Sequence, residues 1–374
     1  MCSSHYCEEH RSARVSSDQL ADVRNICNVF FTVFFQSVLH LNDPVFTVFT
    51  VLIVFFTVLH CVSTNQTVVK EFFLSGFQGS QLLRNVLFLL FLLVFGGTIC
   101  GNLLIIVLVA TSRSLHTPMY FFISQLSISD ILLTTNIVPK LFPILLNNGG
   151  TITYVGCLTQ FYFFCVSEVF ECFLLTVMSY DRYVAICNPL RYTSIMTSTY
   201  CMKMTVMCWL FSIFFSFIDN ITTSTIKFCG QNTINHFFCD IMPLQEIACS
   251  DTFFIQIIMY IQSLPAIIIP TIIIIKCYVY ITITILRIPS NNSRQKAFST
   301  CSSHLIVVSI FYWTIFSVYV VPTKGQSSTI SKILSLLFTV FTPLINPIIY
   351  SLRNKDIKKA FQETLLKYKH SKPR

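Results

Sequence analysis

Three carboxylates lie inside otherwise uncharged, strongly apolar stretches of the sequence: Asp130, Glu168 and Glu171. A carboxylate in an apolar medium either takes up a proton or finds a cation, because an unpaired buried charge is too unfavourable to persist. These residues are therefore candidates for binding a cation or a charged ligand. Glu168 and Glu171 are three positions apart, which places them on neighbouring faces of one helix.

The stretches that carry these carboxylates belong to a larger set. The 374-residue chain is 54% apolar and 11% charged, whereas about 25% of the residues of a soluble domain are charged. A helix needs roughly 20 apolar residues to cross a bilayer core, and the alternating pattern of a membrane barrel is absent. We therefore expect an all-α bundle of seven transmembrane helices, built on the windows 86–112, 119–139, 157–180, 204–218, 252–275, 297–323 and 333–352.

The connecting segments indicate how this bundle is oriented, because Lys and Arg near the ends of spans stay in the cytoplasm. Basic residues follow the first, third, fifth and seventh windows, so we expect a multi-pass protein of the plasma membrane. The seven-helix body, residues 65–353, would start outside the cell, and the C-terminus would be cytoplasmic. The basic residues on that side, besides the tail, are Arg113, Arg182, Arg191, Lys203, Arg287, Arg294 and Lys296.

The tail, residues 354–374, is basic and amphipathic. From Arg353 onwards the chain has eight Lys or Arg residues against two acids. Apolar side chains recur at helical spacing, which predicts a short helix lying on the membrane surface. Anionic lipids rather than nucleic acid are its expected partners. The apolar residues are Ile357, Phe361, Leu365 and Tyr368.

The N-terminal extension, residues 1–64, is of uncertain status. Its first part is polar, whereas Val45–Val62 is an uncharged run of 18 residues. That run is an eighth span, a late signal sequence or a segment that is not native to the protein. An eighth span would move residue 1 to the cytoplasm.

Four short sequence blocks indicate the class of protein more specifically than its composition does. They read LHTPMYFF at 115–122, MSYDRYVAICNPLRY at 178–192, KAFSTCSSHL at 296–305 and PLINPIIYSLRN at 343–354. In this order and spacing they resemble the signatures of vertebrate odorant receptors, a family of rhodopsin-like G-protein-coupled receptors. The resemblance extends from about Asn65 to Lys372.

The resemblance implies a receptor without enzymatic activity that couples to a stimulatory, olfactory-type heterotrimeric G protein and raises cAMP. An arginine beside a carboxylate at a helix end can form a neutralising pair, and release of that pair frees the guanidinium for the partner. Pro347 places a bendable point in the seventh helix. The coupling and activation residues implied by the resemblance are Asp181, Arg182, Tyr183, Tyr278, Asn346, Pro347 and Tyr350.

The resemblance also implies a mostly apolar pocket for small odorants in the outer half of the bundle. Glu168 has no role in the family, and we predict that it faces the ligand and favours amines or strong hydrogen-bond donors. The alternative is a neutral acid bonded to Ser167 or Tyr312. The implied lining is Phe164, Cys165, Glu168, Val169, Gln262, Ser263, Ala266, Tyr312, Ile315, Tyr319 and Thr339.

By the same resemblance, Asn102 and Asn346 are neighbours of Asp130, and Glu171 is its acidic partner. The two carboxylates together would hold a sodium ion as an allosteric modulator, since hard cations take oxygen ligands. The alternative is a protonated, hydrogen-bonded pair. No other cofactor is expected.

The resemblance further implies two disulfide bonds in the outer loops, Cys157 with Cys239 and Cys229 with Cys249. The cysteines lack the CxxC spacing of zinc sites, so metal binding is the weaker interpretation. Asn65 begins the sequon Asn-Gln-Thr just before the seven-helix body, which predicts a glycosylated receptor.

The rival function is a transporter or channel with the three intramembrane carboxylates lining a path. That class predicts internal repeats and interrupted spans, and the sequence contains neither. An intramembrane enzyme would need paired catalytic groups, and His304 is the single histidine of the seven windows.

Overall fold

The computed structural model describes residues 69–319, 328–353 and 355–371. The extension 1–64, its apolar segment 45–62 and the sequon at Asn65 lie outside the described residues. Within the described ranges, seven helices are long and apolar enough to cross a membrane, which confirms the predicted fold class. They are Gln81–Thr111, Pro118–Asn147, Tyr154–Cys187, Ser198–Ser224, Phe253–Leu286, Cys301–Tyr319 and Thr329–Ser351.

These spans are made of continuous helices and of helices joined by short π-helical turns. The helix of each span extends past its apolar window at one end or both, because a helix continues for a turn or more beyond the bilayer core. The elements are α4 (Gln81–Thr111), α5 (Pro118–Asn147), α6 (Tyr154–Cys187), α8 (Ser198–Ser224), α10 (Phe253–Ser263), η3 (Leu264–Ile268), α11 (Ile269–Leu286), α12 (Asn291–Tyr319), α13 (Ser328–Leu336), η4 (Leu337–Phe341) and α14 (Thr342–Arg353).

Local sequence determines where the first two of these helices begin and end. Before α4, the Ser80 hydroxyl accepts a hydrogen bond from the Leu83 N–H at 3.3 Å, which satisfies one free donor of the first turn. Helix α5 begins with Pro118, whose fixed φ suits the first helical position. It ends at Asn148, which adopts a left-handed conformation with φ 57° and thereby stops the helix.

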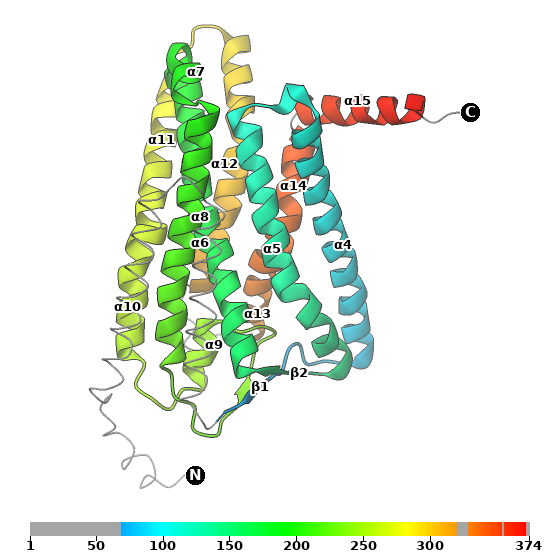
Figure 1. Cartoon of the computed structure of the whole chain (residues 1–374), viewed down its shortest axis with the longest axis vertical. Helices are drawn as coiled ribbons and strands as arrows, with labels where there is room; N and C mark the ends of the chain where they lie inside the picture. The colour runs from blue at the N-terminus through cyan, green and yellow to red at the C-terminus, as the bar shows by residue number, and fades with distance from the viewer. Residues whose placement is uncertain (1–68, 320–327, 354, 372–374) are drawn as a thin grey trace.

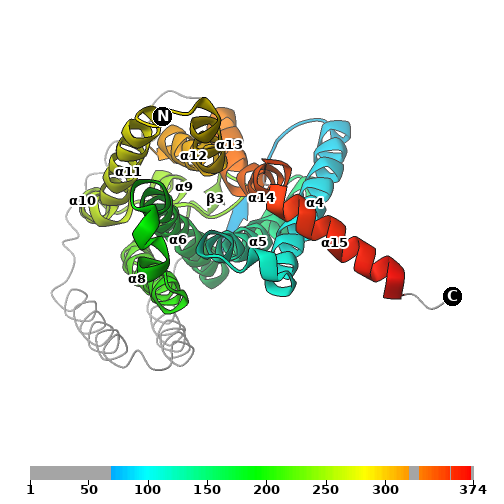
Figure 2. The same ribbon diagram turned by 90° about the horizontal axis from the view of Figure 1, so that it is seen from above.

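Helix α6 lies at the centre of the bundle. It packs against α5, α8 and α11, while α14 packs against α4 and α5 (Figure 2). In the most apolar part of α6, 72% of the residues are buried, against 28% in α4. The residues of α6 are therefore the ones best placed to touch several other helices at once.

A small sheet closes one end of the bundle, which we call the sheet end (Figure 1). Strand β1 (Glu71–Leu74) is central, antiparallel to β2 (Gly150–Thr153) and parallel to β3 (Thr233–Ile234). Phe72 and Leu74 of β1 are buried, whereas Glu71 and Phe73 point outward, as the two-residue period of a strand requires. The sequence predicted helices alone, so this sheet is a correction.

Helix α15 (Lys355–Ser371) lies across the opposite end of the bundle, which we call the α15 end (Figure 1). Ile357 and Ala360 are buried, and the Tyr120 hydroxyl of α5 donates a hydrogen bond to Asp356 at 2.9 Å. Phe361 is exposed, and the side chains of Leu365 and Tyr368 lie outside the described residues. The predicted helix is present, and its contact with lipid stays a prediction.

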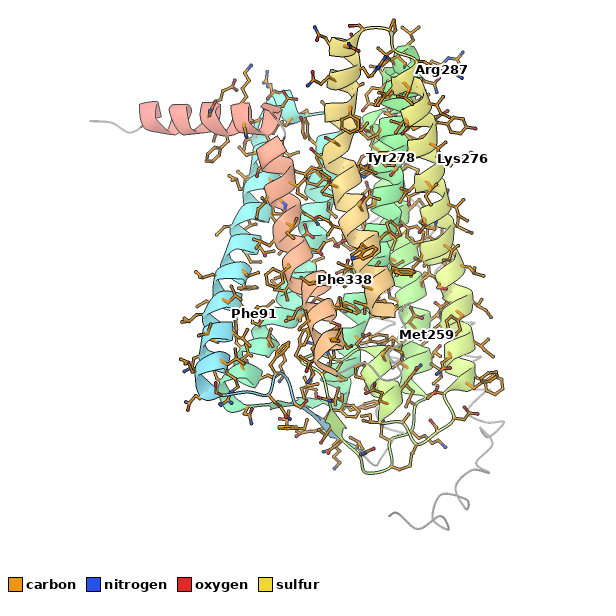
Figure 3. All side chains as sticks on the ribbon, turned by 180° about the vertical axis from the view of Figure 1, so that it is seen from behind. Phe91, Met259, Lys276, Tyr278, Arg287 and Phe338 are labelled. Atoms are coloured by element: carbon orange, nitrogen blue, oxygen red, sulfur yellow. A yellow bond between two sulfur atoms is a disulfide. The ribbon has the colours of Figure 1, made fainter. Side chains whose placement is uncertain are left out.

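The outward faces of the bundle are apolar. Large hydrophobic side chains are exposed along α4, α10 and α11, and Figure 3 shows side chains projecting away from these helices. Lys276 and Arg287 lie toward the α15 end of α11 in the same view. A girdle of exposed apolar side chains is the surface that a bilayer covers, which supports the assignment of these helices as membrane spans.

Candidate functional site

At the α15 end, α6 carries a buried ion pair between Asp181 and Arg182. The Arg182 Nε donates to Asp181 Oδ2 at 2.8 Å, and a second guanidinium nitrogen contacts the same oxygen. Asp181 is fully buried and Arg182 is 9% exposed. Such a pair removes two charges from the interior, and breaking it leaves both uncompensated. The sequence predicted this pair.

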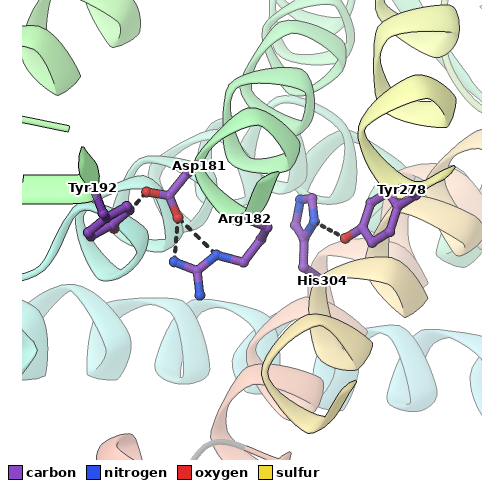
Figure 4. A network of polar contacts seen from close by, with 5 residues as sticks. All are labelled: Asp181, Arg182, Tyr192, Tyr278 and His304. Atoms are coloured by element: carbon purple, nitrogen blue, oxygen red, sulfur yellow. Dashed lines mark hydrogen bonds and ion pairs between the residues drawn. The ribbon is translucent and has the colours of Figure 1, made fainter. Parts of the chain in front are cut away.

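Tyr192 completes the network from outside the membrane spans. It begins the short helix α7 (Tyr192–Ile195), and its hydroxyl donates to Asp181 Oδ1 at 2.8 Å (Figure 4). Burial and the neighbouring Asp181 carboxylate raise the pKa of Tyr192 well above its usual value, so the hydroxyl keeps its proton. The DRYVAICNPLRY block contained Tyr192, but sequence reasoning did not single it out.

A second polar pair lies beside Arg182 and joins α11 to α12. The Tyr278 hydroxyl and the His304 Nδ1 are 2.5 Å apart, and His304 is fully buried (Figure 4). Arg182 acts electrostatically on both residues. The sequence predicted a signalling role for Tyr278 but used His304 only as an argument against an enzyme.

Asn346 of α14 connects the seventh span to the carboxylate of the second. Its amide nitrogen donates to both oxygens of Asp130, at 3.1 and 3.2 Å, and both residues are buried. Asp130 and Glu171 also interact electrostatically, since each is buried close to the other. The structure therefore brings together Asp130, Glu171 and Asn346, as the sequence predicted.

Asn102, the other expected neighbour of Asp130, makes its hydrogen bonds to backbone carbonyls. Its amide nitrogen donates to the Pro343 and Thr98 carbonyl oxygens at 3.1 and 3.0 Å, and none of its hydrogen bonds in the structure goes to Asp130. Pro347 lacks an N–H, so the carbonyl of Pro343, four residues earlier, has no intrahelical donor. Asn102 supplies that donor and thereby ties α4 to α14.

Tyr350 lies between these two groups of residues. Its ring is 2% exposed, and within the described part of the chain its hydroxyl makes no hydrogen bond. Asp130, Arg182 and Glu171 all act electrostatically on it. Its part in coupling and activation, which the family resemblance implies, stays a prediction.

At the sheet end, both expected disulfide bonds are present. Cys157, at the start of α6, pairs with Cys239, and Cys229 pairs with Cys249. The first bridge fixes the segment between α8 and α10 over the end of α6. That segment contains β3 and the short helix α9 (Ile241–Glu246).

The predicted ligand-binding residues are distributed over the helices of the sheet-end half. Phe164 of α6 makes edge contacts with Phe238 and Phe338, at centroid distances of 5.2 and 6.2 Å. Tyr312 lies against Phe311, which in turn contacts Phe338. Buried members of the predicted set, besides Phe164, are Cys165, Gln262, Ala266, Ile315 and Thr339, and the partly buried members are Glu168, Val169, Ser263, Tyr312 and Tyr319.

Glu168 does not make the neutral hydrogen bond that the sequence offered as an alternative. The Ser167 hydroxyl donates to the Phe163 carbonyl at 3.1 Å. Among the described residues, neither the Glu168 Oε1 nor the Tyr312 hydroxyl has a hydrogen-bond partner. The structure therefore pairs Glu168 with neither named hydroxyl, and its role toward a ligand stays a prediction.

Two charged residues near the sheet end were missed as candidates. Asp240 caps α9, accepting from the Ile241 N–H at 2.7 Å, and the Tyr319 hydroxyl is 3.5 Å from its Oδ1. Burial raises the pKa of Asp240 to about 6. Asp219 lies near the end of α8, and it acts electrostatically on Glu168 as Asp240 does.

A buried lysine, also missed, fastens the sheet end. The Lys332 ammonium group of α13 donates to the Gly76 carbonyl at 2.7 Å and to Asn235 Oδ1 at 2.8 Å. The Ser75 hydroxyl donates to the same Asn235 oxygen at 3.0 Å. Burial and the nearby ammonium lower the pKa of His236 to about 3, so this histidine stays neutral.

Comparison with known proteins places these features in a family. A family model described as "Olfactory receptor" matches residues 88–368. The chain is 42% identical over 301 residues to olfactory receptor 11L1 of Homo sapiens, covering 80% of this chain and 94% of that protein. It is 45% identical over 303 residues to olfactory receptor 5G25 of Mus musculus, covering 81% and 95%. It is 41% identical over 305 residues to olfactory receptor 1468 of Rattus norvegicus, covering 82% and 97%.

Proposed function

Because this chain belongs to the olfactory receptor family, we propose that it binds small, mostly apolar odorants and activates a stimulatory, olfactory-type G protein that raises cAMP. Members of the family are G-protein-coupled receptors and not enzymes. Ligands would bind in the sheet-end half of the bundle, among the predicted residues of α6, α10, α12 and η4. The G protein would bind at the α15 end.

The proposed orientation puts the sheet end outside the cell and the α15 end in the cytoplasm. Basic residues at the α15 end support it, since positive charge stays on the cytoplasmic side. Arg113 lies between α4 and α5, Arg191 between α6 and α7, Lys203 in the second turn of α8, and Arg287 directly after α11. The disulfide bonds at the sheet end agree with an oxidising exterior.

The observation that carries the coupling proposal is the Asp181–Arg182 pair with the Tyr278–His304 pair beside it. In this arrangement the guanidinium of Arg182 is occupied by Asp181. A ligand that binds better to an open α15 end shifts the population toward that state. There Arg182 leaves Asp181 and donates to backbone carbonyls of the G protein, while Tyr278 leaves His304 and bonds Arg182.

Asp130 and Glu171 fit a sodium ion. The Glu171 Oε1 is buried and has no hydrogen-bond partner among the described residues, and Asp130 lies close enough to repel it. A cation with oxygen ligands would give the Glu171 oxygen a partner and offset its repulsion from Asp130. Bound there, the ion would neutralise the two carboxylates and favour the arrangement in which Asn346 bonds Asp130.

The test is a ligand panel with a cAMP readout on the full chain at verified surface expression. The panel contains alkanes, esters, aldehydes, alcohols, acids and amines of similar size. A dose-dependent cAMP rise that requires a co-expressed stimulatory G protein supports the proposal. Signals that pass only through another G-protein class would contradict the coupling assignment.

A further inference from the structure

Four carboxylates from three different segments lie in the sheet-end half of the bundle. Glu168 and Glu171 come from α6, Asp219 from the end of α8, and Asp240 from the residue before α9. Asp240, Glu171 and Asp219 all act electrostatically on Glu168. Like charges in a low-dielectric interior repel strongly, so this arrangement raises the question of what balances it.

No ion pair of the described residues involves these four carboxylates. The ion pairs that the described part of the chain forms are Arg182 with Asp181 and Lys359 with Glu363, both at the α15 end. Lys332, the buried lysine of the sheet end, directs its hydrogen bonds to Gly76 and Asn235.

Uncharged donors and acceptors at the same place also lack partners. Gln262 is 9% exposed, and neither its Nε2 nor its Oε1 makes a hydrogen bond within the described part of the chain. Its amide lies beside the Asp219 carboxylate. The Glu168 Oε1 is likewise buried and without a partner. Buried polar groups are normally paired, so unpaired ones on α6 and α10, with the Asp219 carboxylate beside one of them, indicate a missing ligand.

The chemistry of the set favours an organic cation over a metal ion. The described residues contain no group of three or more His, Cys, Asp or Glu side chains placed to hold a metal. An ammonium group instead has up to three N–H donors, which suits carboxylate and amide oxygens that come from several directions. Phe164, one helical turn from Glu168, offers an aromatic wall for an alkyl chain.

We propose that this receptor is tuned to small aliphatic amines, with the protonated amine bound between Glu168 and Asp219 and hydrogen-bonded to Gln262. The inference rests on the proposed odorant-binding function and names its ligand class. Glu168 is the principal counter-ion, because its Oε1 is buried without a partner and Asp240, Glu171 and Asp219 add negative potential at its carboxylate. Asp240, held by its bonds to Ile241 and Tyr319, adds negative potential from the loop side.

The experiment compares pentylamine, pentanol, pentanoic acid and pentane on the full chain and on three variants at matched surface expression. Glu168→Gln keeps the shape of the side chain and removes its charge. Asp219→Asn does the same on the facing helix. Glu246→Gln is the control, because Glu246 is an exposed acid of α9 at the same end.

Pentylamine should be the most potent ligand of the wild-type receptor. Glu168→Gln and Asp219→Asn should each lower its potency about tenfold or more while pentanol changes little, since hydrogen bonds between charged groups are stronger than neutral ones. Glu246→Gln should change neither. If one variant fails to reach the surface, the order of ligand potencies on the wild-type receptor and the result for the other variant test the amine assignment.

A wild-type receptor that responds to pentanol but not to pentylamine would overturn the amine assignment and leave the odorant-receptor function standing. Unchanged pentylamine potency in Glu168→Gln would also overturn it. Silence toward this panel and the broader one, at verified surface expression and with a working G protein, would instead overturn the proposed function and the inference with it.

Discussion

Lys332 and Gly76, 256 positions apart in the sequence, are joined by a hydrogen bond of 2.7 Å from the ammonium group to the backbone carbonyl oxygen. The bond fastens the segment between β1 and α4 to α13. With the bond from Lys332 to Asn235, it ties three parts of the sheet end together. Lys332 is 5% exposed, and its ammonium group therefore stabilises the fold.

Lys332→Met should destabilise the receptor, because it leaves the Gly76 carbonyl without its side-chain donor and removes one of the two donors to Asn235. The expected loss is about 1–3 kcal/mol, the typical effect of removing one partner of a buried hydrogen bond. Thermal unfolding of detergent-purified protein and surface expression measure it. Lys227→Met is the control, since Lys227 is exposed at the same end, and equal stability of the two variants would contradict the role of Lys332.

Cys157→Ser and Cys239→Ser should each remove surface expression, because either change breaks the bridge that fixes the loop over α6. Removing a disulfide from a small secreted domain typically costs about 2–5 kcal/mol. The double variant should be no worse than either single variant, since both single changes break the same bond. Cys100→Ser, at an exposed free cysteine, is the control. Normal expression of Cys157→Ser would show that the bridge is dispensable.

Tyr192→Phe should raise basal cAMP at unchanged surface expression. The substitution removes the hydroxyl that bonds Asp181 and so weakens the hold of that carboxylate on Arg182. A hydrogen bond worth about 1 kcal/mol corresponds to a shift of roughly fivefold in the resting equilibrium. Tyr200→Phe, a partly buried tyrosine of α8, is the matched control. Basal cAMP equal to that of the control would show that the Tyr192 hydroxyl does not help to hold the Asp181–Arg182 pair in the resting state.

Deletion of residues 1–60 should leave trafficking and signalling intact. The aligned 301 residues cover 94% of olfactory receptor 11L1, so that relative has little to correspond to the extension. The sequon at Asn65 remains in the shortened chain. Surface labelling and cAMP assays of the two forms check this. A shortened chain that stays inside the cell while the full chain reaches the surface would show that segment 45–62 is required.

The sequence located all seven spans because excluding charge from a bilayer leaves long apolar windows. Because the windows were drawn to exclude charged residues, they left out Asp219 and Lys332. The fourth window ended at residue 218 and the seventh began at 333, whereas α8 and α13 continue through the charged residues. Buried charge at a helix end is stabilised by partners from distant segments, such as Gly76 for Lys332. Such partners are visible only once the chain has folded.

The remaining differences have the same physical origin. The pairing of β1 with β3 joins segments on either side of four spans, and four-residue or shorter strands leave little periodicity to detect. The sequence named Asn102 and Asn346 as neighbours of Asp130 without indicating which of them bonds it. Asn102 donates to the carbonyl that Pro347 leaves without a donor, whereas Asn346 donates to Asp130.

We propose that Arg182, released from Asp181, transmits the signal to the G protein. The most direct test is agonist-driven cAMP in Arg182→Ala, compared with Arg191→Ala at matched surface expression. Arg191 is an exposed arginine a short distance along the chain, at the same end of the bundle. We expect Arg182→Ala to reach the surface and lose the ligand response, while Arg191→Ala keeps it. A normal ligand response in Arg182→Ala would show that Arg182 does not transmit the signal.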